Sequence, residues 1–451
     1  MSGSKMLRPL AATAALLLAL VGAGCGDDDG DDGGGGGAGA ASFNLTVGDL
    51  VPLTGDLSTF GPPGRKAAEL AIQQAEQALQ GTGVNVAVRH ADTETNPQAG
   101  QQAARQLIDR RASCLMGAWA SGVTVPVATG VTIRQSVPLI SPASTRADIT
   151  ELDDNGFVFR TAPPDKVQAE LSAALIENDL DGAEGKTVSV AARNDAYGEG
   201  YARLFEEAWE GRGGTVTGPV LYNPEQAQFN SEARRIVSGN PDAFLIIDFP
   251  ETYAKVGPAL LRTGDFDTSK LYVTDGLAVG DLGATEIPPE ALNGARGTAP
   301  TTPETGSADA FDRLWDQSNR QPDERQTFDA QNFDATLLCI LAAVAAGSND
   351  AGQIKDQLQN VSGPPGNRYT FEQLGDAVRA LRDGQDIDYE GVSGPINFDD
   401  QGDPASGAYS VFAYEDGELE EQRQVRFSGG ELQFEQEGGT ATTPTATTTT
   451  G

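Results

Sequence analysis

Strand-like apolar runs alternate with helix-like patterns along most of this chain, and this alternation restricts its fold more than any other feature. Residues 45–51 and 84–88 are typical strands, and the segments 67–79 and 98–110 that follow them carry apolar helical faces. Repeated units of this kind predict parallel sheets covered by helices on both faces. Because 451 residues are too many for one compact core, we expect two or three domains.

The stretch 114–145 predicts the place where a ligand binds. Residues 114–117 and 137–141 are short apolar runs, and Val123, Val127 and Val131 fall four apart between them on one helical face. In such a strand–helix–strand unit, the residues after each strand lie at the same edge of a parallel sheet, where open α/β folds bind their ligands.

Two hydroxyl residues, Ser121 and Thr145, stand at this predicted edge. Ser121 begins the helix, so its hydroxyl, the nearby N–H groups and the positive end of the helix dipole could face an anion such as a carboxylate. The alternative is that Ser121 only caps the helix and Thr145 only closes a turn, and this stretch taken alone favours that alternative.

The composition excludes several classes of function. Asp and Glu outnumber Lys and Arg by 65 to 31, and the formal charge of -34 would repel nucleic acid and anionic lipid. With one histidine and three cysteines, we expect no metal site and no cofactor. A Ser-His-Asp mechanism would have to use His90, which follows an alternating apolar run and is better interpreted as a polar residue at a strand end.

The two ends of the chain differ in composition from the middle. Lys5 and Arg8 precede an apolar run and then small residues before Cys25, which is typical of an export signal over residues 1–24. The pattern resembles a bacterial lipoprotein signal, although Gly22 stands where a leucine is usual. We expect lipidation of Cys25, a flexible acidic and glycine-rich tether over 25–42, and a disordered threonine-rich tail over 434–451.

A second series of strands and helices follows the first. Residues 186–191, 215–221, 242–248 and 271–275 are predicted strands, and two of them deliver Phe249 and Asp275 at their ends. Residues 283–304, rich in Gly, Pro and Thr, predict a crossover connection, and the apolar residues 333–346 predict a buried helix.

Seven motifs in this order resemble the substrate-binding proteins of bacterial ABC transporters, in the group that includes the leucine/isoleucine/valine-binding protein. They are VGDLVPLTGDLSTFG, DTETNPQAGQQAARQLI, GAWASGVT, PLISPAST, NDAYGEG, YVTDG and GPINFDDQGD, and the resemblance spans residues 47–427. Each motif is weak alone, whereas their order and spacing are specific.

The resemblance implies an α/β fold of two Rossmann-like lobes with parallel sheets, joined by a hinge of three crossings with the ligand in the cleft between the lobes. Lobe 1 would comprise residues 43–163 and 298–392, and lobe 2 would comprise residues 164–297 and 393–433. The crossings would fall near Pro163, Thr298 and Val392. Residues 396–402 would form the final hairpin of lobe 2, and 362–385, longer than in the leucine-binding member, would hold a loop and a short helix.

The resemblance also assigns site residues. Ser121 and Thr145 match hydroxyl residues that hold the α-carboxylate of an amino acid, the carbonyl of Ala143 matches an acceptor for its amine, and Asp275 matches an acid that pairs with that amine. Asp275 could instead cap a helix or occupy a turn. The residues matching the side-chain pocket, each of which could equally be core, are Phe60, Trp119, Ala120, Tyr197 and Phe249.

We therefore expect a monomeric, extracytoplasmic, lipid-anchored protein that catalyses nothing and delivers an amino acid, branched or apolar, to an ABC permease. Alternatives are a sensory protein that signals to a membrane receptor, or a binder of a related amide or small organic acid. An exported hydrolase lacks support, since the sequence has no G-x-S-x-G motif. Thr95 and Ala120 stand where the leucine-binding member has a disulfide, and whether Cys114 and Cys339 pair is left open.

Overall fold

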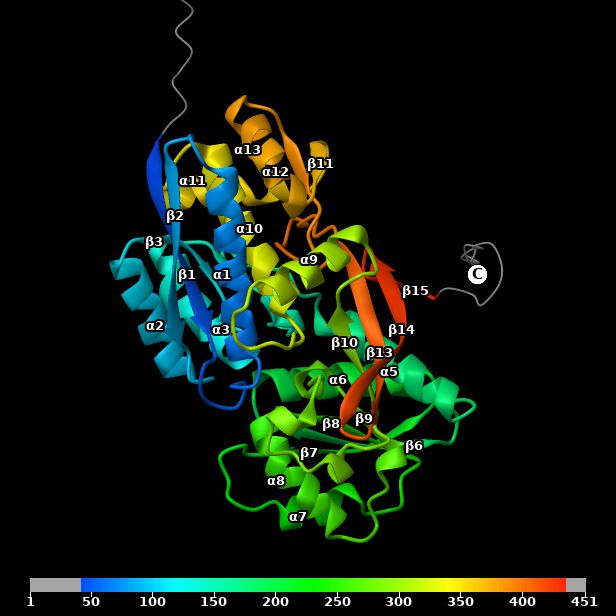
Figure 1. The fold of residues 1–451 in the computed structure, drawn as a ribbon. Coiled ribbons are helices and arrows are strands. Elements are labelled where there is room, and N and C mark those ends of the chain that lie inside the picture. The colour runs from blue at the N-terminus through cyan, green and yellow to red at the C-terminus, as the bar shows by residue number, and fades with distance from the viewer. Residues whose placement is uncertain (1–41, 435–451) are drawn as a thin grey trace, which may run out of the picture. The chain divides into compact units, whose positions relative to one another are not determined.

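The computed structural model describes residues 42–434 as two α/β lobes, each built on its own sheet (Figure 1). The sheet of the first lobe has five strands in the order β2-β1-β3-β4-β5, and every neighbouring pair is parallel. These strands are β1 Phe43–Val51, β2 Val84–Asp92, β3 Ala112–Met116, β4 Leu139–Ser141 and β5 Val158–Arg160.

Helices cover both faces of the first sheet. One face packs against α2 and α3, and the other packs against α1 and α10. The bounds are α1 Gly61–Ala78, α2 Pro97–Asp109, α3 Ser121–Val127, α4 Ile133–Gln135 and α10 Asp329–Ala346, and the turn Ala128–Thr132 joins α3 to α4. Val123, Val127 and Val131 are all buried, which confirms the predicted apolar face of this helix.

The second lobe has an eight-stranded sheet in the order β15-β14-β13-β10-β9-β8-β6-β7. The five strands from β10 to β7 are parallel, and β13, β14 and β15 extend them antiparallel. The strands are β6 Thr187–Arg193, β7 Thr215–Tyr222, β8 Ala243–Ile247, β9 Leu271–Val273, β10 Arg296–Thr301, β13 Ser406–Glu415, β14 Glu418–Ser428 and β15 Glu431–Gln433. Its helices are α5 Asp165–Asp179, α6 Ala196–Gly211, α7 Asn230–Ile236 and α8 Pro250–Leu261.

A smaller group of elements packs around α10 on the first lobe. It includes a two-stranded parallel sheet and the predicted short helix, which is α13. Its elements are α9 Gly306–Gln317, α11 Ala351–Lys355, α12 Leu358–Ser362, β11 Asn367–Tyr369, α13 Leu374–Arg382 and β12 Ile387–Tyr389.

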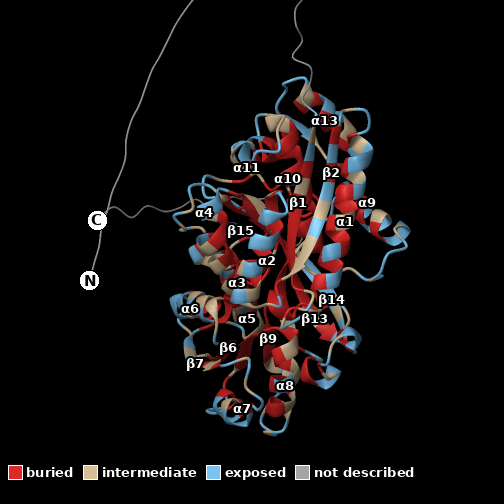
Figure 2. Cartoon of the chain, turned by 90° about the vertical axis from the view of Figure 1, so that its left-hand side faces the viewer, coloured by how far each residue is buried: buried red, intermediate tan, exposed pale blue. Residues whose placement is uncertain are grey.

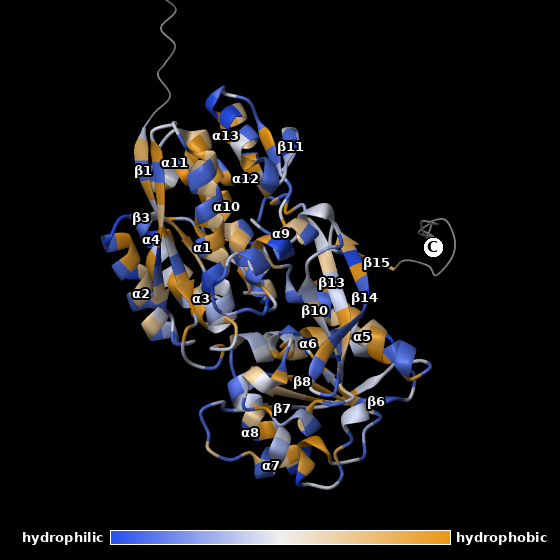
Figure 3. Cartoon of the chain, viewed as in Figure 1, coloured by the Kyte–Doolittle hydropathy of each residue, from blue (hydrophilic) through white to orange (hydrophobic). Residues whose placement is uncertain are grey.

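Figure 2 shows the central strands buried beneath helices with exposed outer faces, and Figure 3 shows hydrophobic residues along β1.

The chain path differs in detail from the expectation at two places. Thr298 lies in the middle of β10, which pairs with β13 over its whole length, so the chain leaves the second sheet only after Thr301. The final hairpin of the second lobe is β13–β14, turning at Asp416 and Gly417. The expected hairpin forms as a small earlier one, in which Phe398 and Pro404 make an antiparallel bridge and Gly402 lies in the turn.

Residues 396–403 contact the first lobe instead of the second. The N–H of Asn397 donates to the carbonyl of Ser362, and Gly402, in a positive-φ turn, accepts from the N–H of Arg160 at 2.8 Å. The buried guanidinium of Arg160 also pairs with Asp403 at 2.6 Å. The other lobe boundaries stay predictions, and Cys25, the tether up to residue 41 and the tail from 435 lie outside the described residues.

Within residues 42–434, no single helix is long and apolar enough to cross a membrane. The helical segments Asp329–Ala346 and Ala351–Ser362 are long and apolar enough when they are taken together, judged by length and composition only, and they are bent by 108° relative to one another.

Cys114 and Cys339 form a disulfide, which answers the question that the sequence left open. The bond joins β3 to α10. The Cα atoms of the two cysteines lie 5.9 Å apart, although 225 residues separate them in sequence. Both sulfurs are buried in the core between the first sheet and α10. The bond therefore links the two parts of the first lobe that the second lobe separates in sequence.

Replacing Cys114 and Cys339 together by Ala should lower the thermal midpoint, because the crosslink restricts the unfolded chain. A disulfide that closes a long loop typically contributes about 2 to 5 kcal/mol, so the midpoint should fall by roughly 3 to 8 °C. Differential scanning calorimetry measures this shift. Reductant should lower the midpoint of the wild-type protein and leave the variant unchanged, and free thiols at both positions in an oxidised sample would contradict the pairing.

Candidate functional site

Strand ends from both lobes surround one small closed cavity, here called the inner cavity. Six strands contribute to it, namely β1, β3 and β4 of the first lobe and β6, β8 and β9 of the second. Its volume is about 20 Å³, which is room for about one water molecule, so this conformation of the site is closed. It is lined by Leu57, Phe60, Trp119, Ala120, Ser121, Ala143, Tyr197, Phe249, Asp275, Gly276 and Phe328.

The cavity brings together eight of the nine predicted ligand residues, and Thr145 is the one that does not line it. Leu57 and Phe328 were missed, whereas Gly276 was expected to face the cleft at the end of its strand, although it was not named as a ligand residue. Leu57 lies in the same motif as Phe60, so the motif that indicated Phe60 could also have indicated Leu57. Phe328 precedes α10 in a polar segment, in a left-handed conformation with φ of 75°, and no sequence pattern marks it.

A buried hydroxyl network fixes the wall that the first lobe contributes. The hydroxyl oxygen of Ser144 lies 2.7 Å from the carbonyl oxygen of Trp119 and 2.7 Å from the hydroxyl oxygen of Thr124, and it donates to one of them. The Thr124 hydroxyl accepts from the N–H of Ala118 at 3.0 Å. The hydroxyl oxygen of Ser121 accepts from the N–H of Arg146 at 3.3 Å. Ser121 does not cap the helix, since Ala120 holds the N-cap position and no side chain caps α3.

Close packing also fixes Trp119, whose backbone φ is 71°. A Cβ atom added to Gly64 of α1 would lie 2.2 Å from the indole ring, so only glycine fits beneath it. The indole N–H is buried and has no acceptor among the described residues.

The wall from the second lobe is centred on Asp275, which follows β9 and is 3% exposed. Its Oδ1 atom accepts from the hydroxyl of Tyr197 at 2.8 Å and from the amide of Gln168 at 3.0 Å. Thr274, and not Asp275, holds the N-cap position of the turn that follows β9. Asp275 is therefore a residue of this turn and not its cap, and it also lines the cavity.

Aromatic stacking completes this wall and leads to a contact between the lobes. The rings of Tyr197 and Phe249 stack with centroids 5.2 Å apart, and the guanidinium of Arg193 lies 3.8 Å from the centroid of Phe249. Arg193 also donates to Asp56 of the first lobe at 2.8 Å. This ion pair bridges the lobes beside the cavity.

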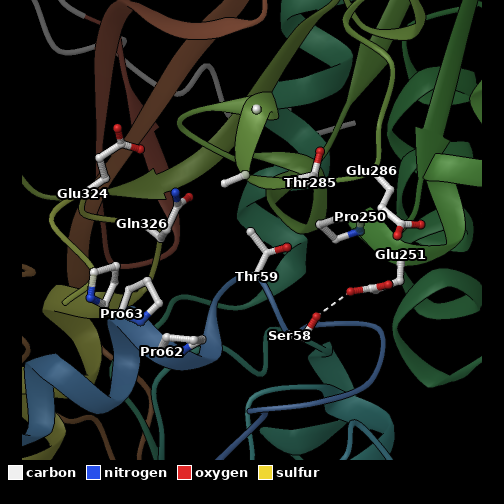
Figure 4. Close-up of a pocket in the computed structure, with 13 residues that line it drawn as sticks. Ser58, Thr59, Pro62, Pro63, Pro250, Glu251, Thr285, Glu286, Glu324 and Gln326 are labelled. Carbon is white, nitrogen blue, oxygen red and sulfur yellow. Dashed lines mark hydrogen bonds between the residues drawn. The ribbon is translucent and has the colours of Figure 1, made fainter.

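A second and larger hollow, the outer cleft, lies between the same two lobes (Figure 4). Ser58 and Thr59 directly precede Phe60, and Pro250 and Glu251 directly follow Phe249, so the cleft and the inner cavity share two chain segments. Its volume is about 460 Å³, and Ser58 donates to Glu251 across it. Its only charged lining residues are acids, which disfavour an anion there: Glu251, Glu286 and Glu324.

Buried acids near the cavity have raised pKa values. Burial, and then the charge of Asp275, raises the pKa of Asp165 to about 8. Burial raises the pKa of Asp275 to about 6, although hydrogen bonds from Tyr197 and Gln168 oppose the shift. Burial raises the pKa of Asp248 to about 7 against the charge of Arg193. Each group ionises more easily in the unfolded chain than in the folded protein.

The ligand-free protein should therefore lose stability as the pH rises from 5 to 8. The folded state retains protons that the unfolded chain has already released above its carboxyl pKa of 3.8, so raising the pH favours unfolding. The loss should be on the order of several kcal/mol, and thermal midpoints at constant ionic strength measure it. With only one histidine in the chain, few other groups titrate in this interval. A midpoint that stays constant or increases would contradict the assignment.

The described residues contain no group of three or more His, Cys, Asp or Glu side chains that could hold a metal ion.

Comparison with known proteins agrees with the geometry. A family model described as periplasmic binding protein matches residues 44–418. The Leu/Ile/Val-binding protein homolog 3 of Brucella melitensis biotype 1 is 26% identical over 376 residues, covering 83% of this chain and 93% of that protein.

Two solved structures share the fold. The branched-chain amino acid transporter substrate binding protein LivJ of Streptococcus pneumoniae, solved with isoleucine, is 20% identical with a TM-score of 0.69, covering 85% of this chain and 99% of that chain. A solute binding protein of an ABC transporter from R. palustris, solved with benzoate, is 18% identical with a TM-score of 0.65, covering 85% and 96%.

These matches confirm the resemblance and the two-lobed α/β fold that it implied. Proteins of this family bind small molecules outside the cytoplasm, work with ABC transporter permeases and are not enzymes. The chain belongs to the periplasmic binding protein family.

Proposed function

We propose that this protein captures an amino acid with a branched or apolar side chain in the inner cavity and delivers it to an ABC permease. One observation supports the proposal: the residues that line the cavity offer a hydroxyl that can donate and a carbonyl that can accept from one lobe, and a buried carboxylate that can accept from the other. The residues concerned are Ser121 and Ala143 of the first lobe and Asp275 of the second. A zwitterion that enters a closed site loses water from both charges, so donors must face its carboxylate and an acid must face its amine.

The rest of the wall suits an apolar side chain. Leu57, Phe60, Trp119, Phe249 and Phe328 contribute apolar surface around the polar groups. The names of the Brucella relative and of the S. pneumoniae structure, which refer to branched-chain amino acids, agree with this assignment.

A small organic acid is the second candidate, because the R. palustris structure holds benzoate. The charges on this chain favour the amino acid. Of the arginines near the cavity, Arg146 pairs with Asp148, Arg160 with Asp403 and Arg193 with Asp56. No arginine among these three is left to neutralise a ligand with one negative charge and no amine.

Binding should require the lobes to open and close, because a cavity of about 20 Å³ cannot admit an amino acid. The lobes also contact one another through side chains beside the cavity, including the pair between Asp56 and Arg193. We propose that the connections between the lobes act as a hinge and that these contacts form as the lobes close on the ligand. Transport and sensing would both use this step, and a neighbouring permease gene would favour transport.

Membrane attachment through Cys25 belongs to the same proposal. Replacing Cys25 by Ala should release the protein from membranes, since the lipid would be its only anchor. Membrane fractionation and mass spectrometry of the native protein measure this. An unmodified Cys25 inside a longer or shorter mature chain would contradict the anchor.

Replacing Asp275 by Asn tests the amine site, since the change keeps the shape and removes the charge. A buried ammonium without its counter-charge typically costs roughly 3 to 5 kcal/mol, so affinity for L-leucine or L-isoleucine should fall by about a hundredfold or more. Isothermal titration calorimetry measures the affinity, and the thermal transition checks the fold. A loss under about threefold with an intact transition would show that Asp275 does not hold an amine.

A further inference from the structure

A further hollow, here called the hinge cavity, lies where the chain passes between the lobes, and its volume is about 620 Å³. The connections from β10 to α9 and from β12 to β13 both line it, through residues of 303–305 and 390–395. The remaining walls come from the start of α9 and residues 368–372 of the first lobe, and from β13, β14 and β15 of the second. Both lobes therefore contribute to this cavity.

The hinge cavity is separate from the inner cavity. The second lobe contributes β6, β8 and β9 to the inner cavity, and it contributes β13, β14 and β15 to the hinge cavity. In the strand order of the sheet, β10 lies between these two groups. The two cavities share no lining residue, so a ligand in the hinge cavity would be a second ligand.

The start of α9 offers hydrogen-bond donors to the hinge cavity. The N–H groups of Gly306 and Ser307 have no acceptor among the described residues, as is usual in the first turn of a helix. Ser307 lines the cavity and is 8% exposed, and its hydroxyl makes no hydrogen bond within residues 42–434. The acids that flank this helix start, Glu304 and Asp309, are exposed and do not line the cavity. A buried hydroxyl without a protein partner indicates that its partner comes from the cavity.

Arg426 of β14 brings a positive charge to the same cavity. Its guanidinium has no ion pair or hydrogen bond in the described part of the chain. Gln424 donates to the carbonyl of Thr302 at 3.1 Å and accepts from the N–H of Glu304 at 3.3 Å. Because alternate residues of a strand share a face, Arg426 lies on the face of β14 that contacts the segment leading into α9.

The acids of the lining limit the charge that a ligand can carry. Arg368 lies 3.2 Å from Glu390 and 3.5 Å from the buried Asp388, so these acids offset its charge. Glu372 is exposed, where water and salt screen its charge. Arg426 is then the lining cation that no described acid pairs with. It matches one negative charge on a ligand, whereas a second negative charge would be repelled by the acids.

We propose that the hinge cavity is a second ligand site, which takes a monocarboxylate with an apolar body. The carboxylate accepts from the N–H groups at the start of α9, from the hydroxyl of Ser307 and from the guanidinium of Arg426. The apolar body packs against the apolar residues of the lining, which are Pro303, Pro395 and Phe427. The inference goes beyond the proposed function and does not depend on it.

Isothermal titration calorimetry of the full chain with 2-naphthoate tests the site. This probe carries one carboxylate on a rigid apolar ring system, and it should bind with a stoichiometry near one. The amide 2-naphthamide has the same shape without the charge, and it should bind at least about tenfold more weakly. Inorganic phosphate has the charge without the apolar body, and it should also bind at least about tenfold more weakly.

Two variants and a matched control locate the probe. Arg426→Gln should weaken the binding of 2-naphthoate about tenfold, and Ser307→Ala should weaken it about threefold. Arg423→Gln makes the same chemical change at another exposed arginine of β14, which does not line the hinge cavity, and it should leave the affinity unchanged. The thermal midpoint of each variant checks its fold.

Each contrary outcome overturns a stated part of the inference. Absence of binding to the wild-type protein at about 5 mM 2-naphthoate overturns the site, and this result needs no variant to fold. Binding that Arg426→Gln leaves unchanged places the probe elsewhere and also overturns the site. Equal affinity for 2-naphthamide or for phosphate overturns the assignment of an apolar monocarboxylate. L-leucine enters none of these titrations, so their failure is distinct from a failure of the proposed function.

Discussion

The carboxyl ends of parallel strands share one edge of a sheet, and the candidate site depends on this constraint. Phe60, Trp119 and Ala143 follow β1, β3 and β4, while Tyr197 and Asp275 follow β6 and β9. Residues separated by more than 200 positions in sequence therefore meet in one cavity without any loop that has to reach across the protein. The two halves of the cavity belong to different lobes, so under the proposed function a rotation between the lobes would assemble or separate the ligand's contacts.

Residue patterns predicted the parts of the fold that depend on local sequence. Val123, Val127 and Val131 mark a helix because burial repeats with the helical period, and all three are buried. The eight predicted residues that line the cavity follow strand ends, and topology alone brings strand ends together.

The remaining features depend on contacts between distant segments, which no local pattern encodes. Residues 396–402 form part of a small hairpin, as their composition indicates, yet contacts with Arg160 and Ser362 bind it to the first lobe. The final hairpin of the second lobe forms later in the chain, from β13, which begins at Ser406. The pairing of Cys114 with Cys339 requires β3 and α10 to be adjacent. Asp165 follows two prolines at a helix start, where an acid is ordinary, so no local pattern marks it as buried.

Ligand charge is the property of this site that the buried acids constrain most strongly. A carboxylate in a closed cavity has lost most of its hydration, and an anionic ligand would add repulsion to that loss. Under the proposed function, a zwitterion would bring its own cation to Asp275, and its carboxylate would then need only hydroxyl and N–H donors from the first lobe. The acidic lining of the outer cleft acts in the same direction, since Glu251, Glu286 and Glu324 disfavour an approaching anion. Under the proposed function, the buried carboxylate of Asp275, more than the aromatic wall, would distinguish this site from that of an organic-acid binder.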